Sequence, residues 1–270
     1  MSATARLLGR RWAGRGSPAL IGLGTVAVLL LAWELAPRVG LVSRVTVPTP
    51  TDTLRGFVQL VSGGYWLGHL RSTLIAVLAA FVLGSTAGFT LGTVLGISPF
   101  VRRVITPYVI ALQALPKVVL APLLIGWLGF GTPSKIAVAT AICFFPVWVN
   151  TMVGLSLPGA DEFRLMASLR ASRWRVFRML QLPSALPMVL VGLKHALLLA
   201  FTGVLVAEIL AGSAGGLGQL AESFAYQLLM PLAFAVVTLV ILIAVALVTL
   251  VDRLEHRIVF WTRPEGADER

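Results

Sequence analysis

Few side chains in this 270-residue chain are placed to do chemistry, and Lys117 is the most conspicuous because it lies inside an apolar stretch at 105–128. Pro116 and Pro122 flank it, and each proline lacks the N–H that would bond the carbonyl four residues earlier. Gln113 lies one helical turn before Lys117 and is expected on the same face. A cation beside freed carbonyls deep in lipid suits an anionic or polar solute. The alternative is a lysine that extends to the membrane surface.

A second group of candidates follows the apolar stretch at 188–212. Glu208 lies near the end of that stretch, and Gly215, Gly216 and Gly218 come shortly after it. No Lys-Ser/Thr pair follows these glycines, so they do not form a phosphate-binding loop. We expect them to form a turn that allows close backbone approach at the outer mouth of a pathway. Glu208 lies either in that pathway or, as the alternative, simply at the membrane surface.

Sets of residues typical of catalysis are missing from the sequence. There is no Walker motif, no H-E-x-x-H and no Ser-His-Asp candidate set. The single cysteine, Cys143, excludes an internal disulfide and a cysteine metal cluster. We therefore expect a chain that is not an enzyme and carries no cofactor or metal.

The segment DEFRLMASLRASRWRVFRMLQLPSALP (161–187) contains five arginines between two apolar stretches. Leu165, Met166 and Leu169 share a helical face, and Ser172 is a typical cap for a second helix. We expect two short amphipathic helices that meet at a corner over 169–172, with Pro183 ending the second helix. Such a corner suits docking into a groove of a soluble protein. Binding to anionic lipid headgroups is the alternative.

The elements that must position these residues are long apolar stretches. The composition is 57% hydrophobic and 12% charged, whereas soluble domains average about 25% charged residues. Lipid is therefore the expected solvent, and each span must be helical because its backbone finds no other partners there. The sequence predicts an all-α membrane protein with six transmembrane helices, at 17–36, 73–97, 105–128, 134–157, 188–212 and 229–252.

The basic residues predict how these helices are oriented. If the N-terminus is cytoplasmic, sixteen of the 22 Lys and Arg residues fall on the cytoplasmic side, five fall outside and Lys117 lies within a span. Lys135 is one of the five counted outside. By the positive-inside rule both termini and the arginine-rich loop are cytoplasmic. The net charge of +11 is spread between apolar stretches, so it does not indicate nucleic-acid binding.

The first outer loop carries its own helix signal. Thr49 is a typical N-cap, and Pro50 suits the first helical position. The Asp52 side chain, at the third helical position, can form a hydrogen bond back to the cap residue. Four apolar residues then share one face: Leu54, Phe57, Val58 and Val61. We expect a short amphipathic helix lying on the outer membrane surface.

Taken together, several segments resemble one family. ASLRASRWRVFRMLQLPSALP is similar to the cytoplasmic EAA loop of ABC-importer permeases, the coupling helix that docks into the ATPase subunit. VPTP, ALPKVVLAPLLIGWLGFGTPSK, FFPVWVNTMVGL and AEILAGSAGGLGQL resemble the nitrate/sulfonate/taurine branch, which also includes permeases for thiamine precursors and riboflavin. The resemblance covers roughly residues 45–260.

The resemblance implies a multi-pass permease of the bacterial inner membrane. Its expected partners are two ABC ATPase subunits that hold ATP and Mg, an extracytoplasmic solute-binding protein and a second permease copy. The implied division is a basic N-terminus at 1–16, the first span and outer helix at 17–72, a transport core at 73–252 with its coupling loop at 158–187, and a tail at 253–270.

The expected contacts with the ATPase lie in the coupling loop, at Glu162, Leu165, Met166, Leu169, Arg170, Ala171, Ser172, Arg173 and Trp174. This loop departs from the family pattern at two places. Arg164, Leu165 and Met166 stand where Glu-Ala-Ala is expected, and Arg170 replaces a glycine. If position 170 needs a left-handed backbone, the arginine costs about 1 kcal/mol.

Two functions of other classes remain as alternatives. An ion-gradient-driven secondary carrier usually has acidic or histidine relays in mid-membrane and an inverted repeat, and the sequence has neither. A membrane scaffold would need only the lipid-binding property of the basic loop. The expected solute is small and anionic or polar: a sulfonate, nitrate, taurine or a vitamin precursor.

Overall fold

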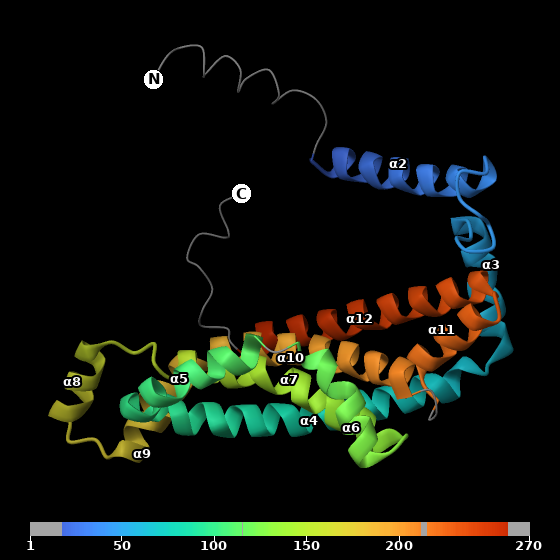
Figure 1. Ribbon diagram of the computed structural model, residues 1–270. Coiled ribbons are helices and arrows are strands. Elements are labelled where there is room, and N and C mark those ends of the chain that lie inside the picture. Colours follow the sequence, from blue (N-terminus) through green and yellow to red (C-terminus); the bar gives the residue numbers. More distant parts are fainter. Residues whose placement is uncertain (1–17, 115, 212–214, 259–270) are drawn as a thin grey trace, which may run out of the picture.

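The computed structural model describes residues 18–114, 116–211 and 215–258, and every regular element in these ranges is a helix (Figure 1). Five of the described helices are long and apolar enough to cross a membrane: α2 (Pro18–Arg38), α4 (Trp66–Ile97), α7 (Thr132–Gly154), α10 (Leu182–Ala211) and α12 (Met230–Ile258). The all-α class is therefore confirmed, and five predicted spans correspond to these helices. Six crossings and the orientation of the termini stay predictions.

The stretch at 105–128 is divided into separate helical elements. It forms the end of α5 (Pro99–Ala114), a 3-10 turn (Lys117–Val119) and α6 (Leu120–Leu128). Pro116 is extended, with φ −67° and ψ 96°, and its carbonyl accepts a 2.9 Å bond from the Val119 amide. A proline both removes a helical donor and disfavours helical backbone in the preceding residue. The helix is therefore broken beside Lys117, as the flanking prolines predicted, and the stretch is not one helix of spanning length.

Helix α7 lies between α4 and α10, and close packing of backbones holds these three helices together. Gly84, Gly88, Gly92 and Gly96 recur at every fourth position of α4 and face α7. A Cβ added at Gly88 would lie 2.6 Å from the carbonyl oxygen of Phe144, closer than any side chain tolerates. Small residues at this spacing let membrane helices approach closely. They form the main packing surface of the bundle.

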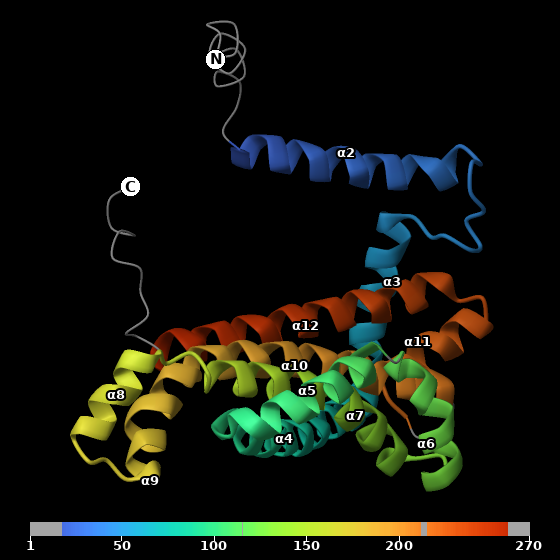
Figure 2. The ribbon, with the colours of Figure 1, turned by 60° about the vertical axis from the view of Figure 1, so that its left-hand side comes forward.

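Helix α3 (Pro50–Gly63) packs across α12 at the end of the bundle where α11 (Leu217–Tyr226) lies (Figure 2). The predicted cap is confirmed, because the Thr49 hydroxyl accepts a 3.1 Å bond from the Asp52 amide. Hydrogen bonding to Thr49, opposed by partial burial and aided by Arg44, lowers the pKa of the Asp52 carboxyl.

The face of α3 that packs differs from the predicted apolar face. Thr53, Gly56 and Leu60 are buried, whereas Leu54 and Val58 are exposed. A Cβ at Gly56 would lie 2.5 Å from the carbonyl oxygen of Pro231. Helix α3 therefore packs against α12 through Gly56 and the Leu60 side chain, and Phe57 of the predicted face joins this cluster, whereas Leu54, Val58 and Val61 stay exposed.

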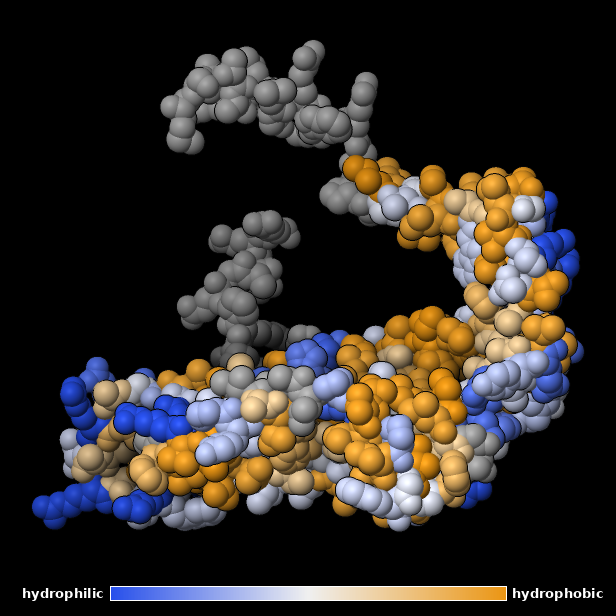
Figure 3. Space-filling model, in the orientation of Figure 1, coloured by the Kyte–Doolittle hydropathy of each residue, from blue (hydrophilic) through white to orange (hydrophobic). Residues whose placement is uncertain are grey.

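Most of helix α2 lies apart from the bundle (Figure 1), and it is joined to the bundle through α3 and through the Trp33 ring, whose centroid lies 6.2 Å from that of Phe234 in α12. Trp33 donates a 3.1 Å bond to the Pro48 carbonyl, and the Glu34 carboxylate accepts one of 3.1 Å from the Thr51 amide. The side of α12 that faces this gap is broadly apolar (Figure 3). Exposed apolar residues of α12 include Val237, Ile241 and Val245. In a membrane this surface must be covered by lipid or by another protein.

Candidate functional site

The arginine-rich loop projects beyond one end of the bundle as two short helices, α8 (Ala160–Ser168) and α9 (Arg173–Val176) (Figure 2). This arrangement confirms the predicted pair of helices with a corner between them. Ser172 caps α9, because its hydroxyl accepts a bond of 3.4 Å from the Arg175 amide. The end of the bundle near these helices is called the α8 end below, and the opposite one the α11 end.

The corner has the backbone geometry of a glycine-type helix stop. The Ala171 amide bonds the Met166 carbonyl at 3.0 Å, and the Arg170 amide bonds the Ala167 carbonyl at 2.9 Å. Arg170 occupies the left-handed position between them, with φ +48°. These are the two bonds of a Schellman motif, in which that residue is usually glycine. Arg170 therefore has the left-handed backbone that the family glycine would adopt, which costs a non-glycine residue about 1 kcal/mol.

Pro183 does not end the second helix, contrary to the prediction. The chain runs from α9 through a π-helical turn (Phe177–Gln181) directly into α10, and Pro183 is the second residue of α10. In the wider turn the Leu182 amide reaches back to the Phe177 carbonyl. In a π-helical turn the amides bond the carbonyls five residues earlier instead of four. The missing N–H of a proline just after such a turn therefore disrupts the helical hydrogen bonds less than it would in a regular helix.

Three large apolar side chains of the corner face outward. Leu165 is 61% exposed, Leu169 65% and Trp174 67%, and the Trp174 ring stacks on Phe177 with centroids 5.6 Å apart. They would be costly in water, and no described part of the chain covers them. Grouped exposed apolar residues mark an interaction surface.

The same two short helices carry several charged side chains. Arg164 pairs with Asp161 at 3.0 Å, but both side chains are exposed, so the pair adds little stability. Glu162 lies in the first turn of α8, where a negative charge is favoured by the helix dipole. The predicted loop residues lie on α8, on the start of α9 and in the corner between them: Glu162, Leu165, Met166, Leu169, Arg170, Ala171, Ser172, Arg173 and Trp174. Leu165, Leu169 and Trp174 are exposed, whereas Ala171 and Arg173 also line a cavity on the inner side of the corner.

A buried polar cluster lies at the α11 end. The Glu208 carboxylate accepts bonds from the Thr73 hydroxyl at 2.8 Å and the Gly218 amide at 2.9 Å, and the Lys135 ammonium lies 3.5 Å away. Lys135 also donates to the Gly215 carbonyl. The Gly216 amide donates to His69 at 3.0 Å. The cluster ties the connection between α10 and α11 to α4 and α7.

The glycines are required for this approach. A Cβ at Gly216, where φ is +131°, would lie 2.0 Å from a Glu208 carboxylate oxygen, and one at Gly218 would lie 2.7 Å from the Leu205 carbonyl oxygen. Residues 212–214 lie outside the described ranges. Glu208 is 1% exposed in this chain, so its place in a solute path stays a prediction.

Lys135, Thr73 and His69 were not predicted as members of a site. Lys135 was counted among the outer loop residues, but it lies in the first turn of α7 and is 1% exposed. The sequence does contain a signal for this pair: Lys135 and Glu208 lie at the outer ends of two predicted spans, and a buried charge needs a partner of opposite charge.

Lys117 lies apart from that cluster, at the break between α5 and α6. Its ammonium lies 4.9 Å from the ring centroid of Phe145, a cation–π contact with a residue in the middle part of α7. Among the described residues it forms no ion pair. Gln113 lies in the last turn of α5, and its side chain is outside the described part.

Comparison with known proteins matches this architecture. The family model described as "binding-protein-dependent transport system inner membrane component" matches residues 84–263. A putative aliphatic sulfonates transport permease of Bacillus subtilis is 32% identical over 199 residues, 74% of this chain and 72% of that protein. A riboflavin transport system permease of Chloroflexus aurantiacus is 32% identical over 250 residues, 93% and 91% of the two chains.

Among solved structures, the inward-facing MetNI methionine ABC transporter has a chain with a TM-score of 0.61 and 19% identity, covering 71% of this chain and 94% of that one. This likeness shows the fold alone. The family match supports a multi-pass protein of the inner membrane. The chain therefore belongs to the inner membrane components of binding-protein-dependent transport systems, the permeases of ABC importers, in the branch that includes the aliphatic sulfonate permeases.

Proposed function

We propose that this permease forms the path for a small anionic or polar solute, and that a separate ABC ATPase drives it through residues 161–181. In this proposal the α8 end and both termini are cytoplasmic. A solute-binding protein delivers the solute at the α11 end. ATP and Mg²⁺ belong to the ATPase, and this chain supplies only the moving path.

The exposed apolar corner carries the coupling part of the proposal. Leu165, Leu169 and Trp174 are each more than half exposed beyond the end of the bundle, and five arginines lie in the same loop. Burying one such side chain in a partner's groove contributes about 1.5–3 kcal/mol. Helix α9 continues through the π-helical turn directly into α10. A displacement of the corner can therefore be transmitted to the α10 span.

The uncovered faces of the chain support a second copy. Tyr108, Leu112, Val118 and Val119 are exposed along α5 and the break that follows it. These residues lie on the same stretch as Lys117. If two copies meet along this stretch, the path lies between them and Lys117 is close to it. The proposal is a homodimer.

Lys117 supports the choice of solute class. A partly buried ammonium beside the middle of a span costs about 2.5–3.5 kcal/mol on insertion scales, so it needs a compensating role. A solute anion would supply the missing charge. One relative is named for aliphatic sulfonates, which are anions, and another for riboflavin, so we propose the class and not a single compound.

Affinity purification of the tagged permease from its host membranes tests the coupling surface. We expect Leu169→Asp or Trp174→Asp to lower the amount of co-purified ABC ATPase by at least about tenfold, because a charge enters the apolar contact. Phe130→Asp is the matched control, since Phe130 is 72% exposed but lies between α6 and α7 at the α11 end. Undiminished ATPase with both loop variants would refute the proposed coupling.

A further inference from the structure

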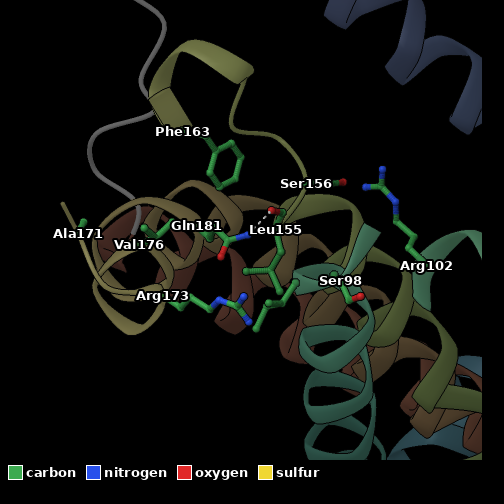
Figure 4. A pocket seen from close by; sticks show the side chains of 11 residues that line it. Ser98, Arg102, Leu155, Ser156, Phe163, Ala171, Arg173, Val176 and Gln181 are labelled. Atoms are coloured by element: carbon green, nitrogen blue, oxygen red, sulfur yellow. Dashed lines mark hydrogen bonds between the residues drawn. The ribbon is translucent and has the colours of Figure 1, made fainter. Parts of the chain in front are cut away.

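A cavity of about 670 Å³ lies on the inner side of the arginine-rich corner, between the corner and the bundle (Figure 4). Its walls come from elements far apart in the sequence: the end of α4, the start of α5, the residues after α7, and α8 with α9. Ile97, Leu155, Phe163 and Val176 make much of the lining apolar. The exposed corner surface with Leu169 and Trp174 is not part of it.

Two arginines give this cavity its charge. Arg102 reaches it from α5 and Arg173 from the start of α9, and the two side chains lie on different sides of the cavity (Figure 4). No acidic residue lines the cavity. Neither guanidinium has a hydrogen bond or an ion pair within the described part of the chain. The lining therefore offers unpaired positive charge above an apolar wall.

The other polar side chains of the lining each have a hydrogen bond, and the Ser98 hydroxyl accepts one of 3.4 Å from the Val101 amide. The Gln181 amide donates to the Leu155 carbonyl at 3.4 Å, and the Ser156 hydroxyl donates to the Val153 carbonyl at 2.7 Å. The two guanidinium groups are thus the main unused donors. Guanidinium groups bind phosphate through paired, charge-assisted hydrogen bonds.

The level of the cavity along the bundle indicates where such a phosphate comes from. Helix α4 ends at Ile97, α7 ends at Gly154 and α10 begins at Leu182, so the cavity lies where three apolar spans stop. In a bilayer this is the depth of the headgroups, and basic pockets at span ends bind lipid phosphates. The apolar walls suit the first carbons of the acyl chains.

We propose that this cavity binds the phosphate headgroup of an anionic phospholipid, with Arg102 and Arg173 as its ligands. The bound lipid would then lie behind the corner and hold α8 and α9 at a fixed distance from the bundle. Leu169 and Trp174, whose substitution tests the ATPase contact, do not line the cavity, whereas Arg173 belongs to both sets of residues. The lipid site is therefore tested by lipid binding and not by ATPase contact.

Native mass spectrometry of the purified full-length permease tests the site. The protein is delipidated and titrated with phosphatidylglycerol or, in a separate arm, with zwitterionic phosphatidylcholine. We expect Arg102→Gln and Arg173→Gln each to weaken phosphatidylglycerol binding by about tenfold, the loss of roughly one charge-assisted hydrogen bond. Arg103→Gln is the matched control, because Arg103 is exposed on the next position of α5 and does not line the cavity. The Arg103→Gln variant should bind phosphatidylglycerol with an affinity within about twofold of that of the wild type.

The other outcomes would overturn the proposal. Equal retention of the two lipids by the wild-type chain would show that no anion is recognised. Displacement of the lipid by millimolar inorganic phosphate would assign the site to free phosphate instead. If Arg102→Gln and Arg173→Gln keep the lipid but lose co-purified ATPase, these arginines contact the partner protein and not the membrane.

Discussion

The ammonium of Lys135 lies 3.5 Å from the carboxylate of Glu208, and both side chains are almost completely buried between α7 and α10. The pair also reaches the glycines that follow α10, through Gly215 and Gly218. Two charges removed from solvent are tolerated only when each is fully paired. The pair therefore fixes the segment from Gly215 to Gly218, at the start of α11, relative to the bundle.

Removing one charge of this pair should destabilise the protein strongly. We expect Glu208→Gln to cost about 3–5 kcal/mol, because Lys135 is left charged without its carboxylate. The double variant Lys135→Met with Glu208→Gln should lose less than the sum of the single variants. Unfolding of the purified permease in detergent, followed by circular dichroism, measures both. Glu222→Gln on α11, which breaks no ion pair in the described chain, serves as the control; equal stability of Glu208→Gln and this control would contradict the prediction.

The glycine spacing of α4 allows a test of the packing. A methyl group at Gly88 would press on the Phe144 carbonyl, so Gly88→Ala should lower the free energy of unfolding by about 1–3 kcal/mol. Gly24→Ala in α2 is the opposite case, because nothing lies within 4 Å of the added methyl group. It should be neutral or stabilise by up to about 1 kcal/mol. The same detergent unfolding assay compares them, and a neutral Gly88→Ala would show that α4 and α7 are less closely packed.

The left-handed backbone of Arg170 predicts two glycine substitutions with opposite effects. Arg170→Gly should stabilise the corner by about 1 kcal/mol because it relieves the strained φ. Arg175→Gly, at a helical position of α9, should destabilise it by a similar amount. Hydrogen exchange of the amides in 165–176 reports both changes. Faster exchange in Arg170→Gly would mean that the corner is not held in this geometry.

The position of Lys117 predicts an effect on transport. Lys117→Ala should raise the KM for an anionic solute by about tenfold or more, the loss of one charge-assisted contact, whereas Lys117→Arg keeps the charge and should lose less. Uptake by proteoliposomes that contain the ATPase and the binding protein measures this, once the solute is identified. ATPase co-purification should be unchanged in both variants. If Lys117→Ala transports the anion with an unaltered KM, Lys117 is not in the path.

The long apolar helices were predictable from the sequence, because a single segment that spans lipid can satisfy its backbone hydrogen bonds only as a helix. The corner of the loop was predictable too, from Ser172 as a cap and from Arg170 in place of a glycine. The break beside Lys117 was predictable from Pro116 and Pro122, although the sequence predicts it inside one span at 105–128. The structure shows that the backbone leaves the helix there altogether.

Other features depend on contacts between distant segments. Lys135 was taken for a loop residue, since nothing local shows that Glu208 and Gly215 come to meet it. Pro183 normally signals a helix end, but the π turn just before it changes the bonding pattern. The recurrence of glycine at every fourth position of α4 is visible in the sequence and is typical of closely packed membrane helices.

The central claim is that the corner at 169–172 faces the cytoplasm and is held there by the ATPase. Cys143 is the only cysteine and is buried, so a single Leu169→Cys substitution can be labelled against a low background. The direct measurement is reaction of this cysteine with a membrane-impermeant maleimide, in intact spheroplasts and in inverted vesicles. We predict labelling only in inverted vesicles stripped of ATPase, and protection when purified ATPase is added back. Labelling in intact spheroplasts would place the corner outside the cell and contradict the account.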